Sequence, residues 1–410
     1  MWIRKLFDLS ALKIAARDSA PEGKGLFRLK IYRDDPGLEG DRSRLSRFVG
    51  RTGLYYFGRA ASQIICEAVK SLFMFSKNAI SWLGFSLGAV VLASGVISRP
   101  LSQAPTRPRS LAIGRAQIPD LGPGASLHGK QPFPPDNPWN QDISNAPVDP
   151  NSANLIAGMG PNDVLHPDFG TVWQGKPNGI PYIVVSGAQP QVPITFTAYG
   201  NESDPGPYPV PRNAPIEGGP DSNTDRHILI IDRDHWKLYE MYWAFPDKSG
   251  AGWNAKAGAA FDLNSNAMRP EGWTSADAAG LPIFPGLVRY DEVFEQREIR
   301  HALRFTVPRS RRAYVFPARH YASGNSDPNL PPMGLRVRLK ASVDISKYSP
   351  PIQVILHALK KYGMFVADNG GGWFLSGAPD SRWSDDELGM LKTIHGRDFE
   401  VVKMGRVVTK

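Results

Sequence analysis

The sequence predicts a mainly β protein: an antiparallel, jelly-roll-like β-sandwich with a few peripheral helices, preceded by one hydrophobic helix. Glycine (40) and proline (37) are too frequent among the 410 residues for a helical bundle and are typical of folds with many turns. Short runs rich in β-branched and aromatic residues recur beyond residue 179, without the regular strand–helix alternation of a parallel sheet. One uncharged apolar stretch, Ala79–Ser98, precedes them.

Each predicted strand is a run of β-forming residues bounded by turn residues. These runs are Ile180–Ser186, Gln191–Tyr199, His227–Asp232, Trp236–Trp243, Arg300–Val307, Ala313–Ala318 and Leu335–Ala341. The third and fourth runs read as one hairpin that turns at Asp232–His235. Capping residues, prolines at the first turn and terminal glycines predict helices over Ser152–Met159, Ile352–Tyr362 and Asp385–His395.

The positive charge of the chain is confined to its N-terminal part. The full sequence has a net charge of +9, but residues 1–110 hold 18 Lys and Arg against 8 Asp and Glu, and the remainder holds 30 against 31. The large C-terminal part is therefore close to neutral, and its net charge would not attract a polyanion. We expect no nucleic-acid partner.

The apolar stretch Ala79–Ser98 is long enough to cross a membrane. Twenty residues span about 30 Å as a helix, the thickness of a bilayer core. Lys70, Lys77 and many arginines precede it, so we expect the N-terminus to stay inside and the C-terminus to lie outside. The stretch is either a permanent anchor or a signal peptide that starts at Met74, in which case residues 1–73 precede the true start. A buried core helix is the third interpretation.

Four regions follow from these observations. Residues 1–78 form a basic N-terminal region, 79–98 the transmembrane or signal segment, 99–135 a linker rich in Pro and Gly, and 136–410 an extracytoplasmic β-rich domain. The only cysteine, Cys66, lies before the apolar stretch. Disulfides, thiol catalysis and cysteine-based metal sites are therefore excluded for the outer domain.

Three Arg-His pairs lie in or beside predicted strands. Their histidines are His227, His301 and His320, and by strand alternation each lies on the apolar side of its strand while its arginine lies on the other. They are either hydrogen-bonded core residues or the floor of a cleft. In a cleft, they would serve general acid–base catalysis or bind a metal such as zinc. The spacing favours acid–base work, since no HxH or HxxxH pattern pre-forms a metal site, and we expect no metal or cofactor.

Arg319-His320-Tyr321 supplies three groups that elimination across a uronic acid requires. A cation neutralises the carboxylate, an imidazole or phenolate removes the C5 proton, and a tyrosine protonates the leaving oxygen. His320 and Tyr321 reach one site only where the strand is irregular. Trp273, in the long polar loop from Phe261 to Gly280, and the Asp368-Asn369 pair before a glycine turn are predicted substrate-binding residues.

Hydrolysis of a glycoside needs two carboxylates at a defined separation. The sequence offers Glu202, Asp204, Glu217 and Asp232, although acidic loop residues more often hold turns. The sequence contains no P-loop, dinucleotide fingerprint, serine elbow or zinc-protease helix.

Several long strings are specific enough to indicate a family. They are NPWNQDISNAPVDPNSANLI, SADAAGLPIFPGLVRYDEV, ARHYAS, PPMGLRVRLKASVDIS and LKKYGMFVADNGGGWFLSGAPDSRW. On these strings the chain from NPWNQDIS to the C-terminus resembles a family of exported bacterial proteins. The resemblance implies export and a single folded unit, and it names no reaction; residues 1–110 lie outside it.

The sequence thus predicts an exported or membrane-anchored protein that acts on or binds polysaccharide or a cell-envelope glycan. If it is an enzyme, we expect a carbohydrate-active lyase ahead of a glycoside hydrolase. Two alternatives remain open: a non-catalytic carbohydrate-binding or structural module, and a metal-dependent hydrolase built on the three histidines.

Overall fold

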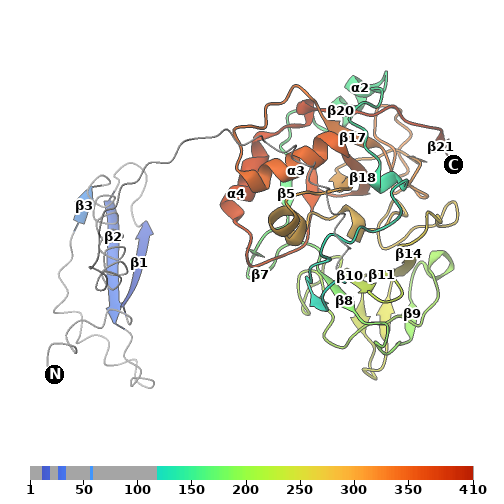
Figure 1. Ribbon diagram of the computed structural model, residues 1–410, viewed down its shortest axis with the longest axis horizontal. Helices are drawn as coiled ribbons and strands as arrows, with labels where there is room; N and C mark the ends of the chain where they lie inside the picture. Colours follow the sequence, from blue (N-terminus) through green and yellow to red (C-terminus); the bar gives the residue numbers. More distant parts are fainter. Residues whose placement is uncertain (1–11, 19–25, 34–55, 59–117, 410) are drawn as a thin grey trace, which may run out of the picture. The chain divides into compact units, whose positions relative to one another are not determined.

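The computed structural model describes residues 12–18, 26–33, 56–58 and 118–409 (Figure 1). The chain divides into two units, Met1–Arg107 and Pro108–Lys410. In the first unit an antiparallel sheet contains β1 (Leu12–Asp18), β2 (Leu26–Arg33) and β3 (Tyr56–Gly58). The predicted membrane-crossing segment, 79–98, lies outside the described residues. Within the described ranges, no helix has the length and apolar character that a membrane span needs.

The second unit contains a mixed six-stranded sheet in the order β20-β17-β18-β15-β19-β5. Its two central strands, β15 and β18, are parallel, as are β19 and β5, whereas the other neighbours are antiparallel. The strands are β5 (His166–Asp168), β15 (Leu303–Val307), β17 (Arg336–Leu339), β18 (Met364–Asn369), β19 (Phe374–Ser376) and β20 (Phe399–Val401).

A five-stranded sheet has the order β14-β11-β10-β8-β4. The hairpin predicted at Asp232–His235 is confirmed, because β10 and β11 pair antiparallel from Asp232 opposite Lys237. β10 is parallel to β8 on its other side. The strands are β4 (Gly122–Pro123), β8 (Tyr182–Val185), β10 (Ile228–Asp232), β11 (Lys237–Tyr242) and β14 (Ala257–Asp262).

Smaller sheets and a few helices complete the unit. The small sheets contain β6 (Val172–Trp173), β7 (Lys176–Pro177), β9 (Ile194–Phe196), β12 (Phe245–Pro246), β13 (Trp253–Ala255), β16 (Ala313–Val315) and β21 (Val407–Thr409). The α-helices are α2 (Ser152–Met159), α3 (Pro350–Lys361) and α4 (Asp385–Gly389). Short helical turns are η5 (Pro138–Asn140), η6 (Gly200–Glu202), η7 (Phe284–Gly286), η8 (Asp291–Gln296), η9 (Met390–Thr393) and η10 (Gly396–Asp398).

The predicted helices are present with adjusted ends. α2 matches its predicted range, and α3 begins at the two prolines after Ser349. The third is shorter than predicted: α4 ends at Gly389, and η9 continues it as a tighter turn. Ser384 caps α4 by accepting a hydrogen bond from the Glu387 N–H, as its capping pattern indicates.

Alternate residues of β10 enter two separate hydrophobic cores. Leu229 and Ile231 face the larger core, which includes Leu303 and Phe305 of the six-stranded sheet. Ile228 and Ile230 face a smaller core on the other side. The five-stranded sheet is thus buried on both faces, which is why β10 reads as an unbroken apolar run.

Two predictions about the architecture need correction. The protein is mainly β with few helices, but both large sheets are mixed and not purely antiparallel. The predicted linker 99–135 extends too far, because residues from 118 onward belong to the folded unit. Leu127 and Phe133 are buried in the core, and the Phe133 N–H bonds to the Leu263 carbonyl at 2.9 Å. The high Pro and Gly content there reflects irregular but packed backbone, and residues 99–117 lie outside the described part.

Candidate functional site

A bulge in β18 places Asp368 on the face of the six-stranded sheet that carries Arg304. Phe305 pairs with Val366, but the next residue of β15, Thr306, pairs with Asp368, so Ala367 is the extra residue. Paired residues of neighbouring strands point to the same face, and so do residues i and i+2 of one strand. Asp368 therefore shares the face of Thr306 and Arg304. Regular pairing would have turned it to the other face.

Arg304 is the buried cation of this face. Its Nε and Nη2 donate to the two carboxylate oxygens of Asp277 at 3.2 and 2.9 Å, and its Nη1 donates to Ser376 Oγ at 2.6 Å. The side chains of Arg304 and Asp277 are 4% and 0% exposed. A bidentate pair of this kind is geometrically rigid, and removing either partner would leave the other charge buried without a counter-ion.

A second ion pair joins the buried His227 to the partly buried Glu217. His227 Nδ1 lies 2.7 Å from Glu217 Oε2, and Nε2 lies 3.0 Å from the Ala276 carbonyl oxygen. Both partners are acceptors, so the ring satisfies both bonds only as an imidazolium that donates twice. Burial by itself would lower the pKa of His227, but the charge and hydrogen bond of Glu217 outweigh it and raise this pKa to about 9. His227 is therefore a fixed cation at neutral pH.

Two further carboxyls adjoin these pairs without a cation of their own. Burial, followed by the charge of Asp277, raises the pKa of Asp368 to about 7. Burial also raises the pKa of Glu240 to about 7, although the Ile283 and Phe284 N–H groups donate to it. We call Glu217, His227, Glu240, Asp277, Arg304 and Asp368 the central charged cluster. It has four carboxyls for two cations, so it holds exchangeable protons near neutral pH.

Asp368 and Glu240 differ in their access to solvent. Glu240 is fully buried, and both of its carboxylate oxygens accept backbone N–H bonds, which is a structural role. Asp368 is only partly buried, and its Oδ1 accepts the Asn369 N–H at 2.6 Å. Asp368 is thus the member of the cluster that combines a pKa near neutrality with access from outside.

The half-buried aromatic residue Tyr242 lies beside the cluster. The Tyr242 ring lies 5.6 Å from the His227 ring, and burial, Asp225 and Asp368 raise the pKa of the Tyr242 phenol. The next residue, Trp243, has a positive φ of 55°. Its ring lies 4.1 Å from the Lys256 ammonium, which is a cation–π contact.

The segment that contains His320 and Tyr321 passes beside the end of β18. Asn369 Nδ2 donates to the Ala322 carbonyl at 3.4 Å, and His320 Nδ1 bonds to the Ala278 carbonyl at 2.9 Å. The two rings stack at 5.3 Å. This segment is not a strand, because β16 ends at Val315. The irregular backbone that His320 and Tyr321 need to reach one site is therefore present. Of the predicted site residues, the structure gathers His227, Asp368 and Asn369 with the His320-Tyr321 segment.

Arg319 and Trp273 belong to a loop scaffold beside this region. The Arg319 Nε donates to the Arg269 carbonyl, and the Arg269 guanidinium lies 5.6 Å from the Trp273 ring. Asp204 pairs with Arg269, and Glu202 accepts the Thr274 N–H.

The four carboxylates proposed for hydrolysis therefore lie in three different parts of the structure. Asp232 accepts the N–H groups of Asp234 and His235 in the hairpin turn. Glu202 and Asp204 hold the Arg269 loop. Of the four candidates, only Glu217 belongs to the central charged cluster.

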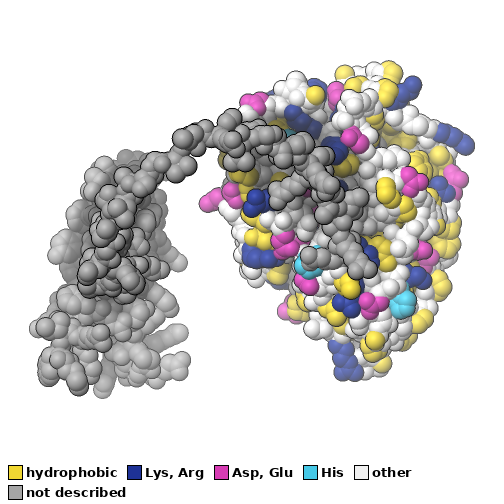
Figure 2. Space-filling view, viewed as in Figure 1, with side chains coloured by type: hydrophobic (Ala, Val, Ile, Leu, Met, Phe, Trp, Pro, Cys, Tyr) yellow, Lys and Arg dark blue, Asp and Glu magenta, His cyan; other side chains and the backbone are white. Residues whose placement is uncertain are grey.

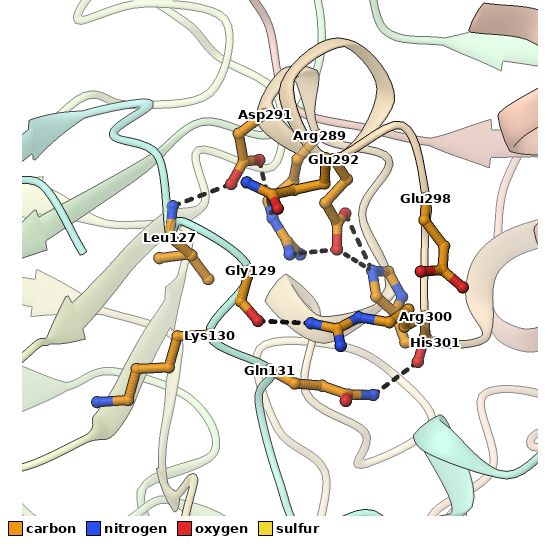
Figure 3. Close-up of a pocket in the computed structure, with 11 residues that line it drawn as sticks. Leu127, Gly129, Lys130, Gln131, Arg289, Asp291, Glu292, Glu298, Arg300 and His301 are labelled. Atoms are coloured by element: carbon orange, nitrogen blue, oxygen red, sulfur yellow. Dashed lines mark hydrogen bonds and ion pairs between the residues drawn. The ribbon is translucent and has the colours of Figure 1, made fainter. Parts of the chain in front are cut away.

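His301 lies in a different place, a small pocket at the start of β15 (Figure 3). Its Nε2 bonds to Glu292 at 3.0 Å, and Glu292 also pairs with the buried Arg289 at 2.6 Å. The pocket is lined by η8, a π-helical turn, and by the segment around Gly129. The Arg300 guanidinium donates to the Gly129 carbonyl at 2.6 Å. These bonds fasten residues 126–131 to the core (Figure 3).

The three histidines do not form a common metal site in the described part of the chain. There, the ligand atoms that lie within 4.8 Å of one another are those of Glu217, Asp225 and His227. Both ring nitrogens of His227 already have acceptor partners, which does not suit a neutral imidazole ligand.

Sequence reasoning missed four members of the cluster region: Asp277, Arg304, Glu240 and Tyr242. Two signals were available, because Arg304 interrupts the apolar run LRFTV and Glu240 interrupts KLYEMY. A charge inside a β-forming run is either on a solvated face or paired in the core. Only knowledge of the residue that pairs with the charge decides between these two cases. For Arg304 this residue is Asp277, which lies in a loop that no spacing rule connects to β15.

Comparisons of the chain with protein-family models, with curated proteins and with solved structures each gave no match. The resemblance to exported bacterial proteins stays a prediction. Figure 2 shows basic and acidic side chains interspersed over the visible face, without an extended area of one sign.

Proposed function

We propose that residues 118–409 form a polysaccharide-active unit in which Asp368 transfers a proton. The observation that carries the proposal is the position of Asp368. It is a partly exposed carboxyl at a strand end, next to two ion pairs of the cluster, with Tyr242 and the His320-Tyr321 segment nearby. Asp277 and Glu217 have cations of their own and Glu240 is fully buried, so Asp368 is the carboxyl of the cluster left free to exchange its proton.

The arrangement favours a lyase over a hydrolase. β-Elimination needs one group to take a proton and another to give one to the leaving oxygen. Asp368 ionises near neutrality, whereas Tyr242, whose pKa burial raises, stays protonated.

The alternative is a non-catalytic carbohydrate-binding module. Its support is that His227, Arg304 and Asp277 are each held by two or more hydrogen bonds, as purely structural buried groups are. In that case the half-buried Tyr242, Trp243 and Tyr321 would contact sugar rings, and Asp368 would only tune the affinity.

Activity of the full-length chain on a panel of polyuronates and neutral polysaccharides tests the proposal. A lyase forms unsaturated products that absorb in the ultraviolet, and a hydrolase forms new reducing ends without that absorbance. Asp368→Asn should abolish product formation and retain binding, whereas the exposed control Asp344→Asn should act as wild type. Binding without product in wild type would establish the module, and neither binding nor product would refute both.

We also propose that the protein is exported, by way of the apolar stretch Ala79–Ser98, and either released or anchored there. Fractionation of cells followed by N-terminal sequencing separates the two outcomes. A mature chain that starts after Ala93 or Ala104 indicates a cleaved signal peptide. An intact chain in the membrane fraction indicates an anchor, and a cytoplasmic chain would contradict export.

We also propose that the two large sheets form a β-sandwich. Its support is the larger core, to which both Leu229 of the five-stranded sheet and Phe305 of the six-stranded sheet contribute. Two sheets that share one core in this way are typical of β-sandwiches.

A further inference from the structure

The hairpin formed by β6 and β7 is a short, rigid projection. Val172 pairs with Pro177 and Trp173 with Lys176. The two connecting residues, Gln174 and Gly175, have φ values of 50° and 80°, as a type I′ turn requires.

The base of the hairpin is closed by a backbone hydrogen bond and is fastened to the rest of the protein through Thr171. The Gly170 N–H donates to the Asn178 carbonyl at 3.0 Å, which closes the hairpin. Thr171 donates its N–H to Asp385 at 2.9 Å and also bonds to it through its hydroxyl. A side chain carried by this hairpin is therefore held in a defined position.

The hairpin exposes the indole ring of Trp173 to solvent. Trp173 is 67% exposed and Val172 is 57% exposed. Among residues 118–409 no ring and no cation packs on the Trp173 indole. Exposed tryptophans on rigid supports offer a large flat apolar surface at little cost in conformational entropy, which is why they are frequent in binding sites.

The face of the hairpin that carries Trp173 is turned toward the Glu217 loop. Trp173 and Lys176 are a direct cross-strand pair, so their side chains lie on the same face. The Lys176 Cδ lies 4.0 Å from the position that a Cβ on Gly219 would take. Gly219 follows Glu217 by two residues.

The hairpin also follows directly from the sheet that carries the cluster. β5, the strand before it, pairs Asp168 with Ser376. Ser376 Oγ accepts the hydrogen bond from Arg304. Two independent connections, one through β5 and one through the Glu217 loop, thus place the hairpin at the edge of the central charged cluster.

The charges at this edge of the central charged cluster determine which class of sugar can bind there. The cluster is rich in carboxyls and would repel an acidic glycan unless a cation near the rim offsets them. Lys176 is exposed, and no carboxylate of the described residues pairs with it. A free ammonium beside an exposed indole matches a sugar ring that carries a carboxylate.

We propose that the β6–β7 hairpin binds a uronic-acid unit of the substrate, with Trp173 stacked on the pyranose ring and Lys176 paired with its carboxylate. This inference rests on the proposed function and deepens it by naming the substrate class. Both residues are binding residues that act before the proton transfer at Asp368.

Binding and turnover of polygalacturonate, alginate and hyaluronate by the full-length chain test the inference, with methyl-esterified polygalacturonate as the uncharged counterpart. Trp173→Ala should weaken binding roughly 10-fold and raise KM with kcat unchanged, and Trp173→Phe should restore most of the loss. Lys176→Gln should weaken binding of the charged polymers about 3-fold at low salt and leave the methyl ester unaffected.

The control is Lys403→Gln. Lys403 is an exposed lysine next to β20, at the opposite edge of the six-stranded sheet from β5, and its removal should change nothing. If wild type binds or cleaves a polyuronate and Trp173→Ala and Lys176→Gln do so equally well, the hairpin inference fails and the proposed function stands. If wild type neither binds nor cleaves any polysaccharide, the proposed function fails and takes the inference with it.

Discussion

Asp368 and Arg304 lie on the same face of the six-stranded sheet because Ala367 bulges out of β18. The bulge brings Asp368 within electrostatic reach of the buried Arg304 guanidinium. The bidentate hydrogen bonds of that guanidinium go to Asp277. Arg304 therefore lowers the pKa of Asp368 without cancelling the effects of burial and of Asp277, which together bring it to about 7. A carboxyl in this situation is poised for proton transfer and costs stability when it ionises.

The first prediction concerns the stability cost of Asp368. Its folded pKa of about 7 lies above its ordinary value of 3.8, so the folded state binds the extra proton between these values. Stability is then lost as pH rises from about 4 through about 7. Asn cannot ionise, so Asp368→Asn should raise the free energy of unfolding by about 1–3 kcal/mol near pH 8 and change little near pH 4.

Urea unfolding at the two pH values measures this difference. The exposed control Asp344→Asn should not stabilise the protein at either pH, because hydrogen bonds from Ser346 lower the pKa of Asp344. A variant at position 368 that is less stable than wild type near pH 8 would show that the ionised carboxylate has a favourable partner.

His227 should also make the stability of the folded protein depend on pH, but over a different pH range. Its folded pKa of about 9 lies above 6.5, so the imidazolium contributes stability that is fully present below about pH 6.5. This contribution is lost as pH rises through about 9, and it should amount to about 2 kcal/mol. NMR titration of the His227 ring and unfolding at about pH 6 and pH 9.5 measure it. Glu217→Gln should lower the pKa of His227 and flatten the dependence, and an unchanged profile would contradict the assigned pair.

Local features of the fold were predictable where one segment decides them. α2 has its predicted range, and the Asp232–His235 turn lies between two well-patterned strands. The pairing of distant strands was not predictable. β15 pairs in parallel with β18, some sixty residues later. The sequence of neither strand indicates whether its neighbour runs parallel or antiparallel to it.

The candidate site was predictable only in part, for a related reason. His227, Asp368 and Asn369 stand out by residue type, and the structure places them together. His301 also follows an arginine in the sequence, but its side chain lies in a separate pocket, where it bonds to Glu292. The alternation argument for His320 fails because β16 ends at Val315. The bulge at Ala367 also lacks a sequence signal such as a strand glycine, so the face of Asp368 had to come from the structure.

The third prediction concerns the buried pair Arg304–Asp277. Arg304→Leu and Asp277→Leu should each destabilise the protein by about 3–5 kcal/mol, because each leaves one buried charge without its partner. The double variant should lose less than the sum of the two, since it buries no unpaired charge. The more exposed pair Arg233–Asp234, in which Nε lies 2.9 Å from Oδ1, is the control, because its side chains are 23% and 47% exposed. Arg233→Leu should cost at most about 1 kcal/mol. Additive losses in the Arg304–Asp277 cycle would show that the two residues act independently.

The fourth prediction concerns where the folded unit begins. Leu127 is 0% exposed, lies within the predicted linker and donates its N–H to Asp291 at 2.9 Å. If this segment is part of the core, Leu127→Ala leaves a cavity and should cost about 2–5 kcal/mol. Leu121, six residues earlier, is 52% exposed, so Leu121→Ala should stay within about 0.5 kcal/mol of wild type. Equal small effects from both variants in urea unfolding would restore the linker interpretation, because a leucine in an extended linker has no cavity to leave.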